Sequence, residues 1–280
     1  MKKIILLSKA YLYKEKIGLL CIIFLLLNIS MFVTFQGSIF SLKDYSQTYQ
    51  SAGLDFFYYL HTIGISPFFF FIFMLLMTNI VSYDFLNHHQ QHYSYHMILR
   101  LDHQKYYRYT LISNFIYTFT IMLLLEGLIL MIIHFFYIPL SFAHFTYPDM
   151  YYAKTLLFSN NPFISLIIFI IITSLGYSLI STLIFTLQVF IINKYVYRCI
   201  GVIIGILLVA GPALIQGYFP NPDLPFLFQI NNLVALGMEN VRENSFGLPH
   251  LILYTISFLM YTGISYASYR FLQKWRRLYD

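Results

Sequence analysis

The sequence is poor in charge. Only 10% of its 280 residues are Asp, Glu, Lys or Arg, against about 25% in a typical soluble domain. Hydrophobic residues make up 59% of the chain, and its mean hydropathy is +0.69. So much apolar surface exceeds what a water-soluble core can bury, and the remainder must face lipid. The composition therefore predicts an all-α polytopic membrane protein with a single transmembrane domain, residues 1–280.

Cysteine is also scarce, and several catalytic motifs are missing. Cys21 and Cys199 are the only two thiols, so neither a disulfide framework nor a thiolate metal site is expected. The sequence contains no GxxxxGK[ST], HExxH or GxSxG pattern, which removes the usual signatures of an ATPase, a zinc protease and a serine hydrolase. We therefore expect no enzyme activity, no catalytic residue and no bound cofactor of its own.

Six stretches are apolar enough and long enough to cross a bilayer, which takes about 20 residues. They are 17–35, 63–81, 109–137, 163–192, 199–218 and 251–271. The first is long and no small-x-small cleavage motif follows it, so it predicts a retained span and not a signal peptide.

The basic residues predict the orientation. Fourteen of the 17 Lys and Arg residues fall in the N-terminal segment, the connectors after the second and fourth spans, and the C-terminal tail. Only Lys43, Lys154 and Arg242 fall in the other loops. By the positive-inside rule both termini are cytoplasmic, which agrees with an even number of spans. We expect a multi-pass protein of the cell membrane. The Phe, Tyr, Ile, Asn and Lys bias is typical of a low-GC Gram-positive bacterium.

Two further segments have unusual composition. Residues 1–16 mix lysines with apolar side chains, which favours either a helix lying on the inner leaflet or a basic start that only sets topology. Residues 219–250 begin with three prolines and continue into an apolar run that is too short to span. This second segment is interpreted as re-entrant or interfacial.

The cytoplasmic connector 84–104 combines aromatic, apolar and histidine residues, a composition that favours a short helix docking in a partner's cleft. Its candidate contact residues are Asp84, His92, Tyr93, His96, Met97, Ile98, Leu99 and Arg100. His88, His92 and His96 would share one helical face, and two such histidines can bind zinc. Because no Glu or Cys lies nearby, we favour a polar face against a protein partner and predict no metal.

Inside the spans, Glu126 is the sole acidic residue well away from a span end. An intramembrane carboxylate usually faces the interior of a bundle or a cavity, so Glu126 has either a structural or interface role or a direct role in transport. Close helix packing, a substrate path or a dimer interface is expected where small and hydroxylated residues gather. Those residues are Ser174, Tyr177 and Ser178 in the fourth span and the GxxxG pair Gly201 and Gly205 in the fifth.

These features together resemble the permease subunits of ABC-2 type exporters. In that family an acidic residue ends the second span, a coupling helix follows, and a turn and basic residues lead into the third span. Here Asp84, the segment Tyr93–Leu99, and then Asp102, Lys105 and Arg108 stand at those places. The basic N-terminal segment, the six spans with both ends inside and the broken segment before the last span also resemble the family.

The resemblance implies two paired permease copies, identical or homologous, each docked through its coupling helix on a separate ABC ATPase that binds ATP and magnesium. The small size and short outer loops are most similar to permeases for lantibiotic immunity or phenol-soluble modulins. The resemblance therefore implies an amphipathic or hydrophobic peptide as substrate and contact with membrane lipid. No nucleic acid partner is expected. The alternatives are a proton-coupled or uncoupled carrier that uses Glu126, an intramembrane enzyme or metal site, and a membrane anchor or sensor subunit.

Overall fold

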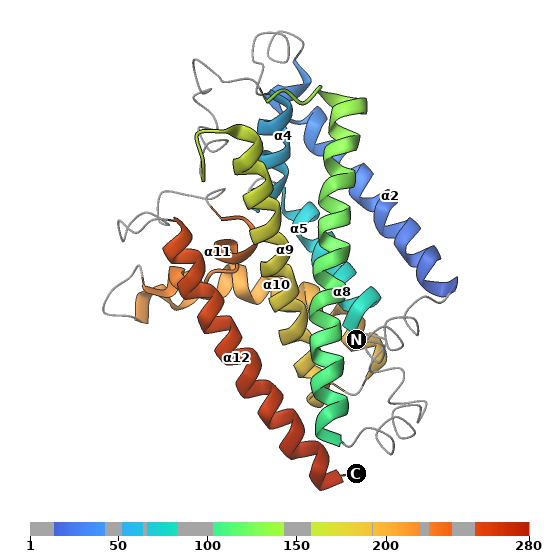
Figure 1. Ribbon diagram of the computed structural model, residues 1–280, viewed down its shortest axis with the longest axis vertical. Coiled ribbons are helices and arrows are strands. Elements are labelled where there is room, and N and C mark those ends of the chain that lie inside the picture. Colours follow the sequence, from blue (N-terminus) through green and yellow to red (C-terminus); the bar gives the residue numbers. More distant parts are fainter. Residues whose placement is uncertain are drawn as a thin grey trace.

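The computed structural model describes residues 14–42, 52–63, 66–82, 103–142, 158–191, 193–218, 224–236 and 250–279 (Figure 1). These residues form helices and no strand. The long helices are α2 (Lys14–Gln36), α8 (His103–Ile132), α9 (Pro162–Thr186), α10 (Lys194–Ile215) and α12 (His250–Tyr279). The shorter ones are η1 (Ile39–Ser41), α4 (Ala52–His61), α5 (Pro67–Leu76), η2 (Met77–Ser82), η3 (Ile133–Tyr137), η5 (Leu187–Val189), η6 (Gln216–Tyr218), η7 (Leu224–Phe228) and α11 (Asn231–Val234).

Five of these helical stretches are long and apolar enough to cross a membrane. They are Gly18–Gln36, Gln104–Tyr137, Pro162–Thr186, Lys194–Tyr218 and Leu251–Phe271, and a shorter apolar helix covers Pro67–Ile80. The described residues therefore confirm two expectations from composition: the protein is helical, and it has several helices able to cross a membrane.

Helix α9 is the centre of the bundle. It packs against α8 and α12 on two sides and against α10, α11 and η2 on others, and Figure 1 shows α8 and α12 running along opposite flanks of it. Asn161 starts this helix, because its side-chain oxygen accepts hydrogen bonds from the backbone N–H groups of Phe163 and Ile164, and Pro162 occupies the first turn, where no N–H is needed.

The side chains of α9 are arranged inside out relative to a soluble protein. Its buried face carries hydroxyls such as Thr173, Ser174 and Ser178, which are all fully enclosed. Its exposed face carries apolar groups such as Phe163 and Ile171. The same apolar exposure covers α2, where Val33 is 62% exposed. Hydroxyls inside and aliphatic side chains outside are what a lipid environment selects.

The second expected span, 63–81, is built from separate pieces. α4 ends at His61, and a new helix starts at Pro67 and continues into the π-helical turns of η2. Proline lacks the N–H of a continuing helix and disfavours the helical conformation at the residue before it, so the chain breaks at Ser66. The fully helical part of this segment is therefore Pro67–Ser82.

Other helix boundaries also differ from the apolar runs. α8 starts at His103, six residues before the expected 109, because helix propensity continues through polar residues that hydropathy leaves out. α9 ends at Thr186, not 192, and its last turn tightens into η5. α10 starts at Lys194, not 199, where the Asn193 side chain caps the N–H groups of Tyr195 and Val196.

The segment between α10 and α12 packs into the bundle. Its residues 230–236 are all buried, and α11 contacts α9 and α12 while η7 contacts α10 and α12. The close approach needs Gly176 of α9, since a Cβ there would lie 2.2 Å from the Leu233 carbonyl oxygen. Pro225 and the described part of the short apolar run thus lie in helical turns inserted among long helices.

The basic residues gather where several long helices begin or end. Lys105 and Arg108 lie in the first turns of α8, Lys194 and Arg198 in the first turns of α10, and Arg270 near the end of α12. In Figure 1 the start of α8 and the end of α12 lie together at the lower end of the bundle. We call this the basic end.

Candidate functional site

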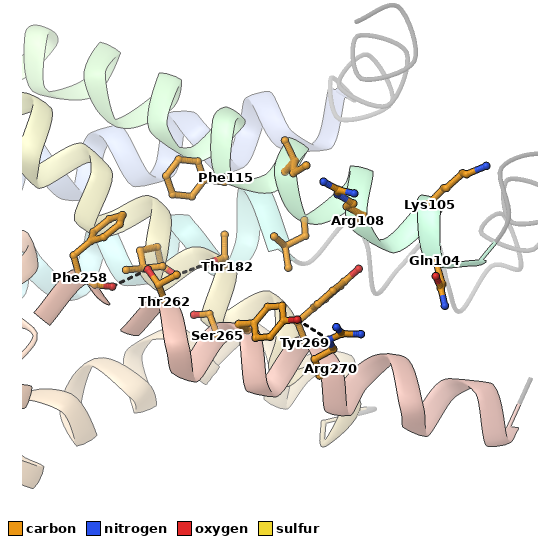
Figure 2. Close-up of a pocket in the computed structure, with 14 residues that line it drawn as sticks. Gln104, Lys105, Arg108, Phe115, Thr182, Phe258, Thr262, Ser265, Tyr269 and Arg270 are labelled. Carbon is orange, nitrogen blue, oxygen red and sulfur yellow. Dashed lines mark hydrogen bonds between the residues drawn. The ribbon is translucent and has the colours of Figure 1, made fainter. Parts of the chain in front are cut away.

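A cleft of about 830 Å³ lies between α8 and α12 at the basic end. Figure 2 shows the side chains of the two helices facing each other across it. Residues from α8, α9 and α12 line it: Gln104, Lys105, Arg108, Leu111, Ile112, Phe115, Leu179, Thr182, Phe258, Thr262, Ser265, Tyr266, Tyr269 and Arg270. Its volume is in the range of small-molecule sites, roughly 300–1,000 Å³.

Helical periodicity explains how the sequence builds this cleft. Lys105, Arg108, Ile112 and Phe115 recur at three- and four-residue spacings, which places them on one face of α8. Residues 258, 262, 265 and 269 follow the same spacing on α12, and residues 266 and 270, also four apart, lie beside them. Both helices pack on α9, which holds the two lining faces apart and supplies Leu179 and Thr182 between them.

One end of the cleft is cationic. Lys105 and Arg108 come from α8 and Arg270 from α12, and Figure 2 shows them at the same end. Arg108 and Arg270 both act electrostatically on the Tyr269 hydroxyl. The Arg270 Nε donates a 2.8 Å hydrogen bond to the Tyr266 hydroxyl, and its guanidinium lies 5.3 Å from the centre of that ring. This pair holds one guanidinium in place and leaves its other N–H donors available.

The other end of the cleft is apolar with a few hydroxyls. Phe115 and Phe258 lie there, opposite the cations (Figure 2). The hydroxyls of Thr182 and Thr262 donate to the backbone carbonyls of Leu179 and Phe258. Ser265 is 6% exposed, and within the described part of the chain its hydroxyl has no hydrogen-bond partner. The cleft is therefore amphipathic along its length.

A second polar feature, the Ser82 junction, connects five elements in the bundle interior. Its members are Ser82 of η2, Asn114 and Thr118 of α8, Ser181 of α9, Gln188 of η5 and Tyr197 of α10. Asn114 Nδ2 donates a 3.0 Å hydrogen bond to Ser181 Oγ, and Thr118 Oγ1 lies 3.0 Å from the same oxygen. The Ser82 hydroxyl lies 3.4 Å from both Asn114 Oδ1 and Ser181 Oγ.

The same junction reaches α10 through Gln188. Its Nε2 donates to the Ser82 carbonyl at 2.8 Å and lies 3.2 Å from the Tyr197 hydroxyl, which in turn donates to the Ile184 carbonyl at 3.1 Å. Hydrogen bonds of this kind hold transmembrane helices in register. Motion of Ser82 is therefore coupled to α8, α9 and α10.

A third feature is a buried pair of titratable side chains, His61 and Glu126. Glu126 is completely enclosed, and both of its carboxyl oxygens lie 3.1 Å from His61 Nε2. The opposite ring nitrogen, Nδ1, lies 2.9 Å from the Phe57 carbonyl oxygen. A carbonyl only accepts, so Nδ1 carries a proton, and Nε2 and the carboxyl group share one more. The pair therefore has no net charge, which lowers the cost of enclosing it.

The residues expected at a substrate path or dimer interface lie inside this bundle. Ser174, Tyr177 and Ser178 are buried on α9, and Ser178 donates to the Ser174 carbonyl. Gly201 and Gly205 lie where α10 meets α5 and η2 of the same chain: a Cβ on Gly201 would sit 2.0 Å from Thr78 Oγ1 of η2 and 2.4 Å from the Met74 carbonyl oxygen of α5. None of these residues lines the cleft.

The expected coupling residues all lie outside the described residues. This holds for Asp84, His92, Tyr93, His96, Met97, Ile98, Leu99 and Arg100 in the connector, for residues 1–13 of the N-terminal segment and for His88. The described residues that bracket the connector are Ser82 and His103.

Sequence reasoning missed the cleft and the partner of Glu126. The sequence marks Arg108 as an orientation signal and as a basic residue leading into the third span, and Arg270 as an orientation signal alone. Yet Phe115 follows Arg108, and Tyr266 precedes Arg270, at helical spacing on the same face. His61 lies between the first two expected spans, two residues before the expected start of the second. A titratable residue so close to a span end is the signal that identifies such a partner.

No protein-family model, no curated protein and no solved structure matches this chain.

Proposed function

We propose that this chain is the transmembrane permease subunit of an ATP-driven exporter of the ABC-2 type. A separate ATPase would dock on the connector 84–104, and a second permease copy would complete the transporter. The substrate class is amphipathic or hydrophobic peptides, taken from the cell membrane or the cytoplasm.

The observation that carries this proposal is the Ser82 junction. An ATPase can drive a permease only if force on the docking segment reaches the spans. The connector starts immediately after Ser82, whose hydroxyl and carbonyl bond to α8, α9 and η5. Its last two residues, 103 and 104, are the first two of α8 itself. A push on such a segment would therefore reach α8 and α9 through the hydrogen bonds of Ser82 and through the start of α8.

A six-span topology supports the same proposal. The pieces α4, α5 and η2 lead from the turn η3 at the end of α8 to the Ser82 junction near the other ends of α8 and α9, as their contacts indicate. Together with the five long helices, these pieces would make six crossings, of which they are the second in chain order. Both termini and the connector then lie on the side of the basic end, which the positive-inside rule assigns to the cytoplasm. The inserted segment η7–α11 would then be the re-entrant piece between the fifth and sixth spans.

The test is purification of the chain from its native membrane in mild detergent. An ATPase with a phosphate-loop motif is expected to co-purify with it. The triple variant Met97→Asp, Ile98→Asp and Leu99→Asp should lose that ATPase, since three buried charges would disrupt an apolar docking face. The matched control, Met150→Asp with Tyr151→Asp and Tyr152→Asp in an expected outer loop, should keep it. An intact complex in the connector variant contradicts the coupling assignment.

The carrier alternative has one observation in its favour, the enclosed His61–Glu126 pair, which can hold a single shared proton. A proton-coupled carrier must bring such a group into contact with water on each side in turn. Neither residue lines the cleft, and His61 is anchored at Nδ1 to the Phe57 carbonyl. This arrangement fits a structural role better, so the exporter remains our proposal.

A further inference from the structure

The cleft between α8 and α12 has a charge pattern that the export function does not explain. None of the described residues that line it is acidic. In the described part of the chain, the carboxylates whose side chains are defined are Asp55 and Glu126, and both are buried elsewhere in the bundle. Lys105, Arg108 and Arg270 therefore face one cavity with no carboxylate in it to balance them.

The length of the cleft matches one leaflet of a membrane. From Arg270 to Phe258 the helix advances about 18 Å at 1.5 Å per residue, whereas half of a hydrocarbon core about 30 Å thick is about 15 Å. The cations lie at the basic end and the aromatic groups lie towards the middle of the bundle (Figure 2). A ligand that fits has an anionic head beside the cations and an apolar tail along Phe115 and Phe258.

We infer that this cleft binds one anionic phospholipid from the leaflet at the basic end. Arginine suits a phosphate because its planar fork donates two parallel hydrogen bonds, and basic pockets between spans on the cytoplasmic side are known sites for anionic head groups. The free hydroxyl of Ser265, enclosed in the cleft wall, is a further donor for an ester or phosphate oxygen.

The Arg270 guanidinium is held in a fixed position, as expected of a binding site and not of an isolated surface charge. Its bond to the Tyr266 hydroxyl and its stacking on that ring fix the guanidinium before any ligand arrives. A preorganised donor costs less side-chain entropy on binding. This inference does not rest on the exporter proposal, since it requires only that the basic end meets a lipid leaflet.

A tryptophan reporter in the cleft tests the inference. The variant Trp275→Phe removes the single native tryptophan, and Phe258→Trp then places one in the cleft. The protein is reconstituted in phosphatidylcholine vesicles that contain a minor fraction of brominated phosphatidylglycerol, whose bromine atoms quench nearby indoles. Brominated phosphatidylcholine at the same fraction measures contact with bulk lipid. A second reporter, Phe24→Trp on the exposed face of α2, reports contact with the lipids that surround the protein.

The cleft reporter is expected to be quenched more by the anionic lipid than by phosphatidylcholine, while the α2 reporter shows little preference. Each cation near a membrane surface contributes about 1 kcal/mol, or roughly fivefold. Removing Arg108 and Arg270 together, as Arg108→Gln with Arg270→Gln, should therefore lower the preference about fivefold per residue. The control pair Lys194→Gln with Lys274→Gln, at exposed positions outside the cleft, should preserve it.

Equal quenching of the cleft reporter by both lipids overturns the inference, because the cleft would then not select an anionic head group. Absence of quenching by either lipid also overturns it and leaves the cleft to an occupant other than a lipid, such as a peptide. Relief of quenching by millimolar inorganic phosphate at constant ionic strength also overturns it, because the cations would then recognise phosphate without the tail. Circular dichroism of the arginine variant checks that it remains helical. Arg108→Lys with Arg270→Lys, which keeps both charges, should restore part of the preference.

Discussion

His61 at the end of α4 and Glu126 in the last third of α8 meet through contacts of 3.1 Å to both carboxyl oxygens, although 65 residues separate them in the chain. Both side chains are enclosed. The pair joins α4, which precedes the second expected span, to α8 and so fixes α4 against α8. Because Phe57 occupies the other ring nitrogen, every polar atom of the imidazole is satisfied.

The first prediction concerns stability. Glu126→Gln should leave the unfolding free energy nearly unchanged, because the amide N–H can donate to a neutral His61 Nε2. Glu126→Leu should cost about 1–3 kcal/mol, the usual penalty for leaving a buried polar atom unpaired. Thermal unfolding in detergent, followed by far-UV circular dichroism, measures the difference. In the double variant His61→Phe with Glu126→Leu most of the loss should be recovered, since no unpaired polar group remains.

The second prediction separates the exporter from the carrier. Glu126→Gln keeps the hydrogen bond but removes the carboxyl group that a proton-coupled carrier would need, so ATP-dependent peptide export should persist in vesicles that contain the ATPase. A proton-coupled carrier would lose transport in the same variant, and its wild-type activity would need no ATPase. Loss of transport in a well-folded Glu126→Gln protein would therefore reverse our preference.

The third prediction concerns the packing of α10 on α5. A methyl group at Gly201 would meet Thr78 Oγ1 at 2.0 Å and the Met74 carbonyl oxygen at 2.4 Å, and backbone cannot move aside cheaply. Gly201→Ala should therefore destabilise the protein by about 1–3 kcal/mol, the typical cost of overpacking. The matched control is Gly263→Ala on α12, where no heavy atom lies within 4 Å, and it should be neutral or slightly stabilising. Equal effects of the two changes would contradict the packing account.

Part of this structure could be predicted from sequence because lipid imposes a simple rule on it. Long apolar runs become helices, and the hydroxyls of α9, including Ser174 and Ser178, face the interior as small polar residues in spans usually do. Glu126 was expected to face the bundle or a cavity, and it faces the bundle. These outcomes depend on composition within a single segment.

The remaining features depend on pairing between segments, which one sequence does not encode visibly. The cleft joins Arg108 to Arg270 across 162 positions, and each residue alone looks like a flanking charge. Hydropathy treats 63–81 as uniform, whereas Pro67 divides it from α4 and thereby brings His61 to Glu126. The π-helical turns of η2 also gave no signal, because they are stabilised by contacts with α9 and α10.

The fourth prediction tests the Ser82 junction. Asn114→Ala and Ser181→Ala each remove one side of a 3.0 Å interhelical hydrogen bond. A double-mutant cycle should give a coupling of about 0.6 kcal/mol, the mean for such bonds in membrane proteins. In an exporter the same variants should lower peptide transport more than ATP hydrolysis, because the hydrogen bonds that link Ser82 and the connector to α8 and α9 would be weakened. Equal losses of both activities would place the junction outside the coupling route.

The last prediction concerns topology, on which the connector's access to ATP depends. Cys21 and Cys199 are exposed thiols, so both are first replaced by serine. Lys274→Cys then reports the end of α12, and Asn160→Cys reports the turn before α9, both at exposed positions. A membrane-impermeant maleimide added to intact cells should label the cysteine at 160 and leave the one at 274 unlabelled until the cells are opened. The charge asymmetry demands this order, because moving the basic end across the membrane would expose the connector and the tail to the outside. Labelling of position 274 in intact cells would put the basic end outside, where no ATPase could reach the connector.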